Sequence, residues 1–195
     1  MSVIRVNPED VRAYASFANE RFEAIRGELE ALTSQVATVH YFGPNAVQFK
    51  TRCGEMAAEF SNALLSDLGG IADAVSASTS AISGSLGGEP VNIAVNGSTV
   101  TPPPVEPGDG SVDIDTSALE ALKPVVSQRF GALQEALAAH LNRLEGTDWQ
   151  GTAKERAVEE VRGFTSTARG RSDEAQNSIN STIDQQISAV MSADR

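Results

Sequence analysis

One pattern of residues occurs twice in this chain, and the second occurrence lies 108 positions after the first (149 − 41). The triplet Trp149-Gln150-Gly151 corresponds to Tyr41-Phe42-Gly43 at this offset. Around both triplets, apolar residues fall on apolar residues over roughly 60 positions, which indicates an internal repeat. A repeated unit that cannot bury its own apolar face packs against its copy. The chain is therefore expected to form a dimer within itself.

The spacing of apolar residues predicts two helices in each copy. Apolar side chains recur three and four positions apart, which places them along one face of a helix. In the first copy these stripes cover residues 11–39 and 46–75. In the second copy they cover residues 119–144 and 157–190. Each copy is thus a helix, a short turn that holds the triplet, and a second helix.

The domains expected from this pattern are two helical hairpins, residues 1–86 and 114–195. Asn7 and Asp115 precede the first helix of each hairpin and have the side chains that cap helix N-termini. The residues expected to pack the hairpins against each other are Phe22, Ile25, Leu29, Phe130, Leu133 and Leu137.

Residues 87–113 form a linker rich in Gly, Pro and Asp, without a basic residue. Residues 91–100 resemble two short strands around Asn96-Gly97, a strong hairpin signal. The alternative is a linker that is partly structured against the helices. Fully extended at ~3.1 Å per residue, the linker reaches ~80 Å, enough to follow a helix of ~50 Å. That reach favours an all-α, antiparallel four-helix bundle with the linker along its side.

Composition argues against several classes of partner. The net charge is −11 and no basic patch is present, so neither nucleic acid nor an anionic membrane is an expected ligand. No stretch approaches the ~20 apolar residues of a membrane span. The N-terminal residues lack a basic segment followed by an apolar run, so we expect no cleavable signal peptide.

Catalytic and metal chemistry are not indicated. The two histidines, His40 and His140, lie in different copies and have no Cys or carboxylate at metal-binding spacing. We interpret His140 as an exposed or boundary residue, and Cys53, the only cysteine, as a small buried thiol. The expectation is a protein that is not an enzyme, without catalytic residues, metal or cofactor.

The doubled helix–turn–helix pattern resembles the WXG family, the ESAT-like proteins that type VII (ESX) systems of actinobacteria and firmicutes secrete. Trp149-Gln150-Gly151 matches the family triplet in full, and Tyr41-Phe42-Gly43 matches it with Tyr in place of Trp. The first copy is therefore a degenerate WXG hairpin. Family members pair as antiparallel dimers of two hairpins, and this chain resembles such a pair fused into one monomeric pseudo-dimer.

The resemblance implies a non-enzymatic type VII substrate, secreted as a folded bundle and recognised by the secretion ATPase. It makes the two turns the candidate recognition site, with the residues Trp149, Gly151, Tyr41, Phe42 and Gly43. From its chemistry alone, Trp149 either packs over the end of its hairpin or serves as a partly exposed anchor for another protein.

One element of the family signal is missing. Family members carry Tyr-x-x-x-Asp/Glu after the second helix of one partner, and no tyrosine follows Tyr41 here. Another protein could supply this element. The alternative function is therefore a cytoplasmic adaptor or chaperone that pairs with a larger type VII effector.

Overall fold

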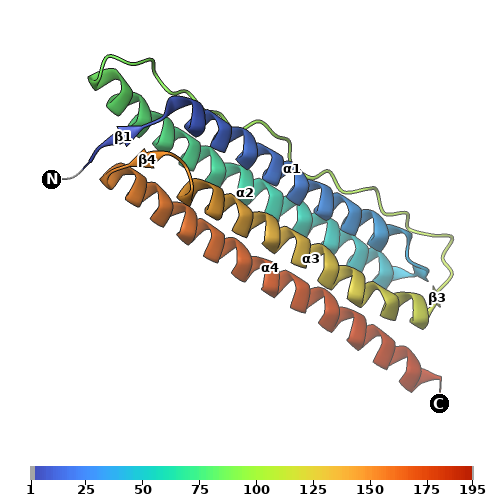
Figure 1. Ribbon diagram of the computed structural model, residues 1–195. Helices are drawn as coiled ribbons and strands as arrows, with labels where there is room; N and C mark the ends of the chain where they lie inside the picture. Colours follow the sequence, from blue (N-terminus) through green and yellow to red (C-terminus); the bar gives the residue numbers. More distant parts are fainter. Residues whose placement is uncertain (1–2, 195) are drawn as a thin grey trace. The chain divides into compact units, whose positions relative to one another are not determined.

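Four long amphipathic helices make up the fold, in the order that the apolar stripes predict (Figure 1). The computed structural model describes residues 3–194. The helices are α1 (Pro8–Thr38), α2 (Pro44–Ser85), α3 (Thr116–Glu145) and α4 (Thr152–Ala193). The predicted all-α four-helix bundle is confirmed. Within the described residues, no helix combines the length and the apolar character that crossing a bilayer requires.

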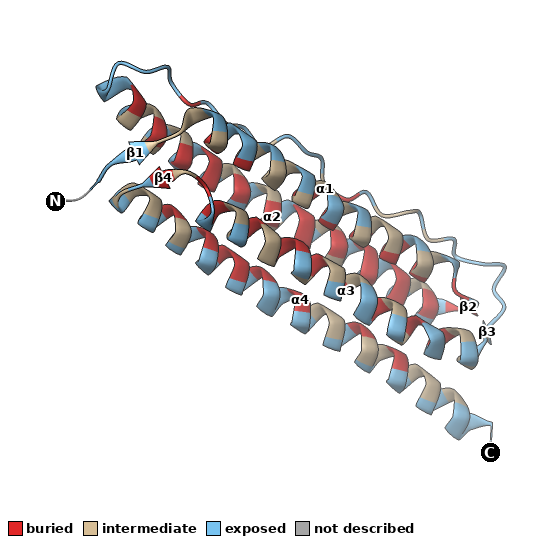
Figure 2. Ribbon diagram, in the orientation of Figure 1, coloured by how far each residue is buried: buried red, intermediate tan, exposed pale blue. Residues whose placement is uncertain are grey.

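The helices pack into two compact units, and each unit contains one stretch of every helix. Unit 1 consists of Met1–Ile25, Ala63–Ser98 and Glu135–Arg169. Unit 2 consists of Arg26–Asn62, Thr99–Gln134 and Gly170–Arg195. Buried residues line the inner faces of the helices, and exposed residues cover the outer faces (Figure 2).

The six residues expected to pack the hairpins together are all buried, with exposed fractions of 3% or less. Those in unit 1 are Phe22, Ile25 and Leu137, and those in unit 2 are Leu29, Phe130 and Leu133. Burying one such side chain fully contributes about 1.5–3 kcal/mol, so these stripes supply much of the driving force for helix packing.

Two short antiparallel strand pairs join each turn to the start of the other hairpin. The strands are β1 (Arg5–Val6), β2 (Tyr41–Phe42), β3 (Asp113–Ile114) and β4 (Trp149–Gln150). In unit 1, β4 of the second hairpin pairs with β1, directly before α1. In unit 2, β2 of the first hairpin pairs with β3, directly before α3. Each turn therefore lies beside the open end of the other hairpin, which is the predicted antiparallel arrangement.

The helix N-termini repeat the same hydrogen bonds 108 positions apart (115 − 7). Asn7 Oδ1 accepts hydrogen bonds from the backbone amides of Glu9 and Asp10, and Asp115 Oδ1 accepts them from the two corresponding residues of α3. The backbone amide of Asn7 donates to the carbonyl oxygen of Asp148, and that of Asp115 donates to the carbonyl oxygen of His40, both at 2.9 Å. The predicted caps are confirmed, and each also ties its helix to the turn of the other hairpin.

The linker does not form the hairpin that Asn96-Gly97 suggests. Among the described glycines, positive φ occurs only at Gly43, Gly87, Gly108, Gly110 and Gly151, whereas a two-residue hairpin turn there would need it at Gly97. A Cβ on Gly97 would lie 2.5 Å from Phe22 Cε1, so the absence of a side chain lets the linker pass close to α1. The alternative expectation, a linker structured against the bundle, describes this segment.

The glycines of the two triplets are required by backbone conformation. Gly43 and Gly151 have φ values of 116° and 121°, a region that L residues rarely adopt. We predict that Gly43→Ala and Gly151→Ala each lower the free energy of unfolding by about 1–3 kcal/mol. Gly27→Ala is the control, since Gly27 lies in α1 with nothing within 4 Å of an added Cβ. It should raise stability by about 0.5–1 kcal/mol in the same urea titration.

Candidate functional site

The Trp turn forms a closed corner in unit 1. Trp149 in β4 pairs with Val6 in β1, and only 1% of its surface is exposed. Its indole Nε1 is buried and has no hydrogen-bond partner among the described residues. Trp149 therefore packs over the end of its hairpin, the first of its two possible roles, and its ring is not an exposed anchor.

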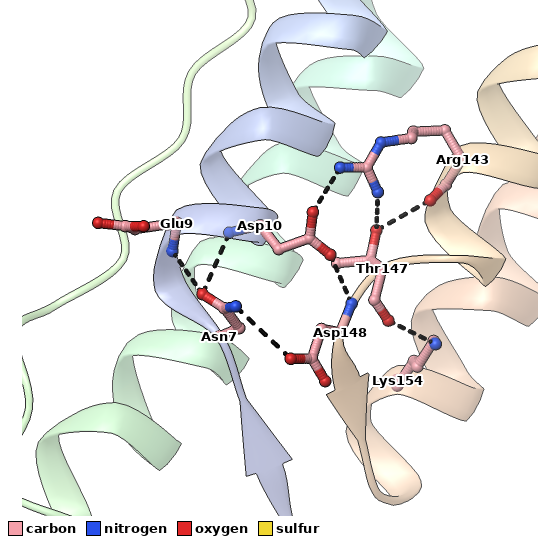
Figure 3. A network of polar contacts seen from close by, with 7 residues as sticks. All are labelled: Asn7, Glu9, Asp10, Arg143, Thr147, Asp148 and Lys154. Carbon is pink, nitrogen blue, oxygen red and sulfur yellow. Dashed lines mark hydrogen bonds and ion pairs between the residues drawn. The ribbon is translucent and has the colours of Figure 1, made fainter.

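A polar network surrounds this corner and connects α1 to the turn after α3 (Figure 3). Asp10 accepts two hydrogen bonds of 2.6 Å, one from the Asp148 amide and one from Arg143 Nη2. The same guanidinium donates through Nη1 to Thr147 Oγ1 at 3.1 Å, and Lys154 Nζ donates to Thr147 O at 2.8 Å. The Asp148 amide, followed by the Arg143 side chain, holds the pKa of Asp10 below its ordinary value. An ionised carboxylate thus fixes the turn to α1.

The Tyr turn in unit 2 keeps the backbone geometry but presents a different surface. Tyr41 is buried and donates from its hydroxyl to Gln186 Oε1 at 2.7 Å. Phe42 is 40% exposed, although its counterpart in the Trp turn is the polar residue Gln150. The His40 ring lies edge-on to Phe42, with 5.1 Å between centroids, and Lys50 Nζ lies 5.1 Å from the Phe42 centroid.

An exposed aliphatic residue covers the glycine of each triplet, and neither was among the predicted site residues. Ile4 is 63% exposed and Val112 is 80% exposed. A Cβ built on Gly151 would lie 3.7 Å from Ile4 Cγ1, and one built on Gly43 would lie 3.4 Å from Val112 Cγ1. Ile4 and Val112 are themselves 108 positions apart (112 − 4), so extending the repeat toward the N-terminus would have identified them.

The five residues predicted for recognition therefore divide between two sites. Trp149 and Gly151 form the corner in unit 1, whereas Tyr41, Phe42 and Gly43 form the corner in unit 2. Of the aromatic side chains of Trp149, Tyr41 and Phe42, only that of Phe42 has substantial exposed surface. At the Trp turn the exposed side chains include those of Ile4, Gln150 and Arg5, the strand partner of Gln150.

The expectation of an exposed or boundary position for His140 was wrong. His140 is 3% exposed and its Nε2 lies 2.8 Å from the hydroxyl of Tyr14, itself buried in α1. The Phe164 ring packs edge-on against the imidazole, with 6.0 Å between centroids. Burial lowers the pKa of His140 to about 4. The signal was available, because His140 occupies the position 108 residues after Leu32, a member of the predicted stripe.

A half-open groove between α2 and α4 in unit 2 contains Cys53. The groove has a volume of about 180 Å³ and is lined by both polar and apolar side chains, Phe49 and Ile179 among them. Burial raises the pKa of the Cys53 thiol to about 12, which keeps it protonated and unreactive near neutral pH. The predicted buried thiol is confirmed. Among the described residues, no three His, Cys, Asp or Glu side chains gather as potential metal ligands.

Comparison with known proteins gives no relative for this chain: no family model matches it, and neither a curated protein nor a solved structure matches it.

The buried indole leads to a prediction about stability. Trp149→Ala should lower the free energy of unfolding by about 3–5 kcal/mol, because it removes the largest fully buried side chain and leaves a cavity. Gln150→Ala, one residue further along β4 and exposed, should stay within about 0.5 kcal/mol of the parent. Chemical denaturation followed by circular dichroism measures both. Equal stability of the two variants would contradict a packing role for Trp149.

The buried histidine leads to a prediction about pH. The pKa of His140 in the folded chain, about 4, lies below its ordinary 6.5, so below pH 6.5 the unfolded chain binds a proton that the folded chain excludes. Stability should therefore fall as the pH drops from about 6.5 to about 4, by up to about 3 kcal/mol.

The double variant Tyr14→Phe/His140→Leu tests the source of this loss, since it removes the titrating group and its partner together. Denaturation at pH 7 and pH 5 should show a smaller difference for the variant than for the parent. An unchanged difference would assign the acid sensitivity to other groups. Asp10 is not the source of this loss between pH 7 and pH 5. Its pKa is lowered from 3.8, so the stability that it contributes is lost only below about pH 3.8.

Proposed function

We propose that this chain is a non-enzymatic substrate of a type VII secretion system, exported as a folded helical bundle and active through contacts with other proteins. The Trp-x-Gly turn carries the proposal, since Trp149-Gln150-Gly151 lies between the two amphipathic helices α3 and α4 as the triplet does in the WXG family. The antiparallel pairing of the two hairpins adds support, because members of that family pair in this way.

The surface by which the Trp turn is recognised consists of the residues around the indole. Trp149 is buried, so a partner would contact exposed residues of the same corner, Gln150 in β4 and Ile4 against Gly151. Trp149 then acts as a positioning residue, which holds β4 against β1 and fixes the two exposed side chains. The pair offers one aliphatic side chain and one side-chain amide to a protein contact.

A second candidate function is an intracellular adaptor that pairs with a larger effector. One observation favours it. The Tyr turn presents the exposed apolar side chains of Phe42 and Val112 together with the His40–Asp113 pair, in which His40 Nε2 lies 2.8 Å from Asp113 Oδ2. This surface offers an apolar contact with a polar rim.

Fractionation of the native host, with and without its type VII ATPase, tests the function. We expect the chain in the medium only when the ATPase is present. Ile4→Ser should reduce export several-fold while leaving the melting temperature unchanged, because Ile4 is exposed. Met191→Ser in α4 is the matched control, an exposed apolar residue in unit 2 with 51% of its surface accessible, and it should be exported normally.

Retention in the cytosol with a functional ATPase would contradict the substrate function. In that case the adaptor function predicts a co-purifying effector, and Phe42→Ser should weaken its capture while Met191→Ser does not. Loss of export in both Ile4→Ser and Met191→Ser would show that the Trp turn has no special part in recognition.

A further inference from the structure

In unit 1, residues 89–96 of the linker lie against α2 through a row of serine hydroxyls. Ser83 Oγ donates to Glu89 O at 2.6 Å. Ser80 Oγ donates to Val91 O at 2.8 Å and accepts the Val91 amide at 2.9 Å. One helical turn earlier, Ser76 repeats this double contact with the carbonyl and amide of Ile93, at 3.2 and 3.0 Å. The α2 side chains thus bind the backbone of every second linker residue.

The other edge of the same segment is bound by α1. Arg12 Nη2 donates to Pro90 O at 3.3 Å. Asn19 Nδ2 donates to Ala94 O at 3.1 Å, and Asn19 Oδ1 accepts the Asn96 amide at 2.9 Å. Residues 89, 91 and 93 therefore bond to α2, and residues 90, 94 and 96 bond to α1. This alternation is that of an extended strand, whose backbone groups point to opposite edges at successive residues.

The side chains of the segment alternate as well. Val91 is fully buried, and Ile93 and Val95 are half-buried, whereas Asn92 and Asn96 are exposed. Ile93 and Val95 line a small cavity together with residues of three helices, among them Ala18, Ile71 and His140. We name this recess the α1–α2 groove and define it by Arg12, Asn19, Ser76, Ser80 and Ser83. Its floor is apolar, and its two edges are polar.

The groove has the chemistry of a sheet edge that accepts a peptide. In strand addition, backbone hydrogen bonds supply affinity and pockets for alternate side chains supply specificity. Here, serine and asparagine side chains of two helices replace the backbone groups of a neighbouring strand. Such contacts select an extended backbone with aliphatic residues at alternate positions and place little demand on the residues between them.

We propose that the α1–α2 groove is a binding site for an extended segment of another protein, with aliphatic residues at alternate positions, and that residues 89–96 occupy it as an internal competitor. The internal segment is exchangeable because most of its contacts are hydrogen bonds, whose net contribution to stability is small, since water replaces them when the segment leaves. Val91 is the one residue among 89–96 that is buried, and Gly87 and Gly88 precede the segment. Tethering gives the segment an effective concentration on the order of millimolar, against which an external peptide must compete.

The test compares the intact chain with a full-length variant in which residues 89–96 are replaced by Gly and Ser at equal length. The probe is a fluorescent peptide with the sequence of residues 88–98. We expect the replaced chain to bind it at least about tenfold more tightly than the intact chain, since the internal competitor is gone. Circular dichroism must first show that both chains have the same helicity.

Variants of the peptide and of the groove test how recognition occurs. Methylation of the peptide nitrogens equivalent to Val91 and Ile93 removes the donors to Ser80 and Ser76, and it should abolish binding. Replacement of the residues equivalent to Asn92 and Asn96 by Ser should leave binding unchanged. In the replaced chain, Ser76→Ala/Ser80→Ala should weaken binding at least about tenfold, as the loss of four hydrogen bonds predicts. Ser66→Ala, an exposed serine of α2, is the control.

Several outcomes would overturn the proposal. A folded replaced chain that does not bind the peptide would show that the groove has no affinity of its own. Equal binding of the methylated peptide would show a nonspecific apolar contact, and equal binding by the intact and replaced chains would place the peptide elsewhere. Should the replaced chain fail to fold, Val91→Ser in the intact chain decides instead, because it weakens the internal segment and leaves the groove residues unchanged. It should admit the peptide more readily if the segment is exchangeable, and no uptake would contradict exchange.

A second copy of this chain is the competing occupant. Analytical ultracentrifugation of the intact chain should show a monomer across the concentration range of the peptide experiment. A concentration-dependent dimer that disappears when residues 89–96 are replaced would assign the groove to linker exchange between copies, and it would overturn the assignment to a foreign peptide.

Discussion

The reciprocal closure of the two turns is the constraint on which the rest of the fold depends. Each triplet forms its strand pair with residues that precede the first helix of the other hairpin. The amide of each capping residue, Asn7 or Asp115, then donates to the residue before the opposite triplet. Because a two-residue strand pair has little stability alone, the apolar stripes must hold the helices in place while the turns determine which ends meet. Hydrophobic packing supplies the free energy, and the turns supply the register.

Much of this arrangement could be predicted from the sequence because the repeat carries it. A residue such as Leu29 and its counterpart Leu137 has to serve the same role in both copies, so each copy supports the interpretation of the other. The caps were predictable for a similar reason, since Asn and Asp before a helical stripe have a specific local chemistry that needs no tertiary context. The antiparallel topology was predictable from the length of the linker. Only antiparallel hairpins need a linker long enough to run along a whole helix.

The remaining features depend on contacts that a local pattern does not contain. Asn96-Gly97 is a hairpin signal only where the two flanking strands can pair with each other, and here α1 and α2 bind that segment instead. The burial of His140 is hard to predict because the next residue, Leu141, is the apolar one at this point of the 119–144 stripe, although Leu141 is only half-buried. The exposure of Trp149 was open on chemical grounds, and its burial results from β1, which comes from the other hairpin.

Joining both hairpins in one chain has a consequence for how their surfaces can differ. In a pair of separate but identical hairpins, any substitution at one turn would appear at both. Within one chain the residues of the two corners can change independently. The two hairpins still pair one to one, because they are covalently joined. Phe42 and Gln150 illustrate the result, because the same backbone position carries an apolar ring at one corner and an amide at the other. Covalent fusion thus converts a symmetric scaffold into one with two distinguishable faces.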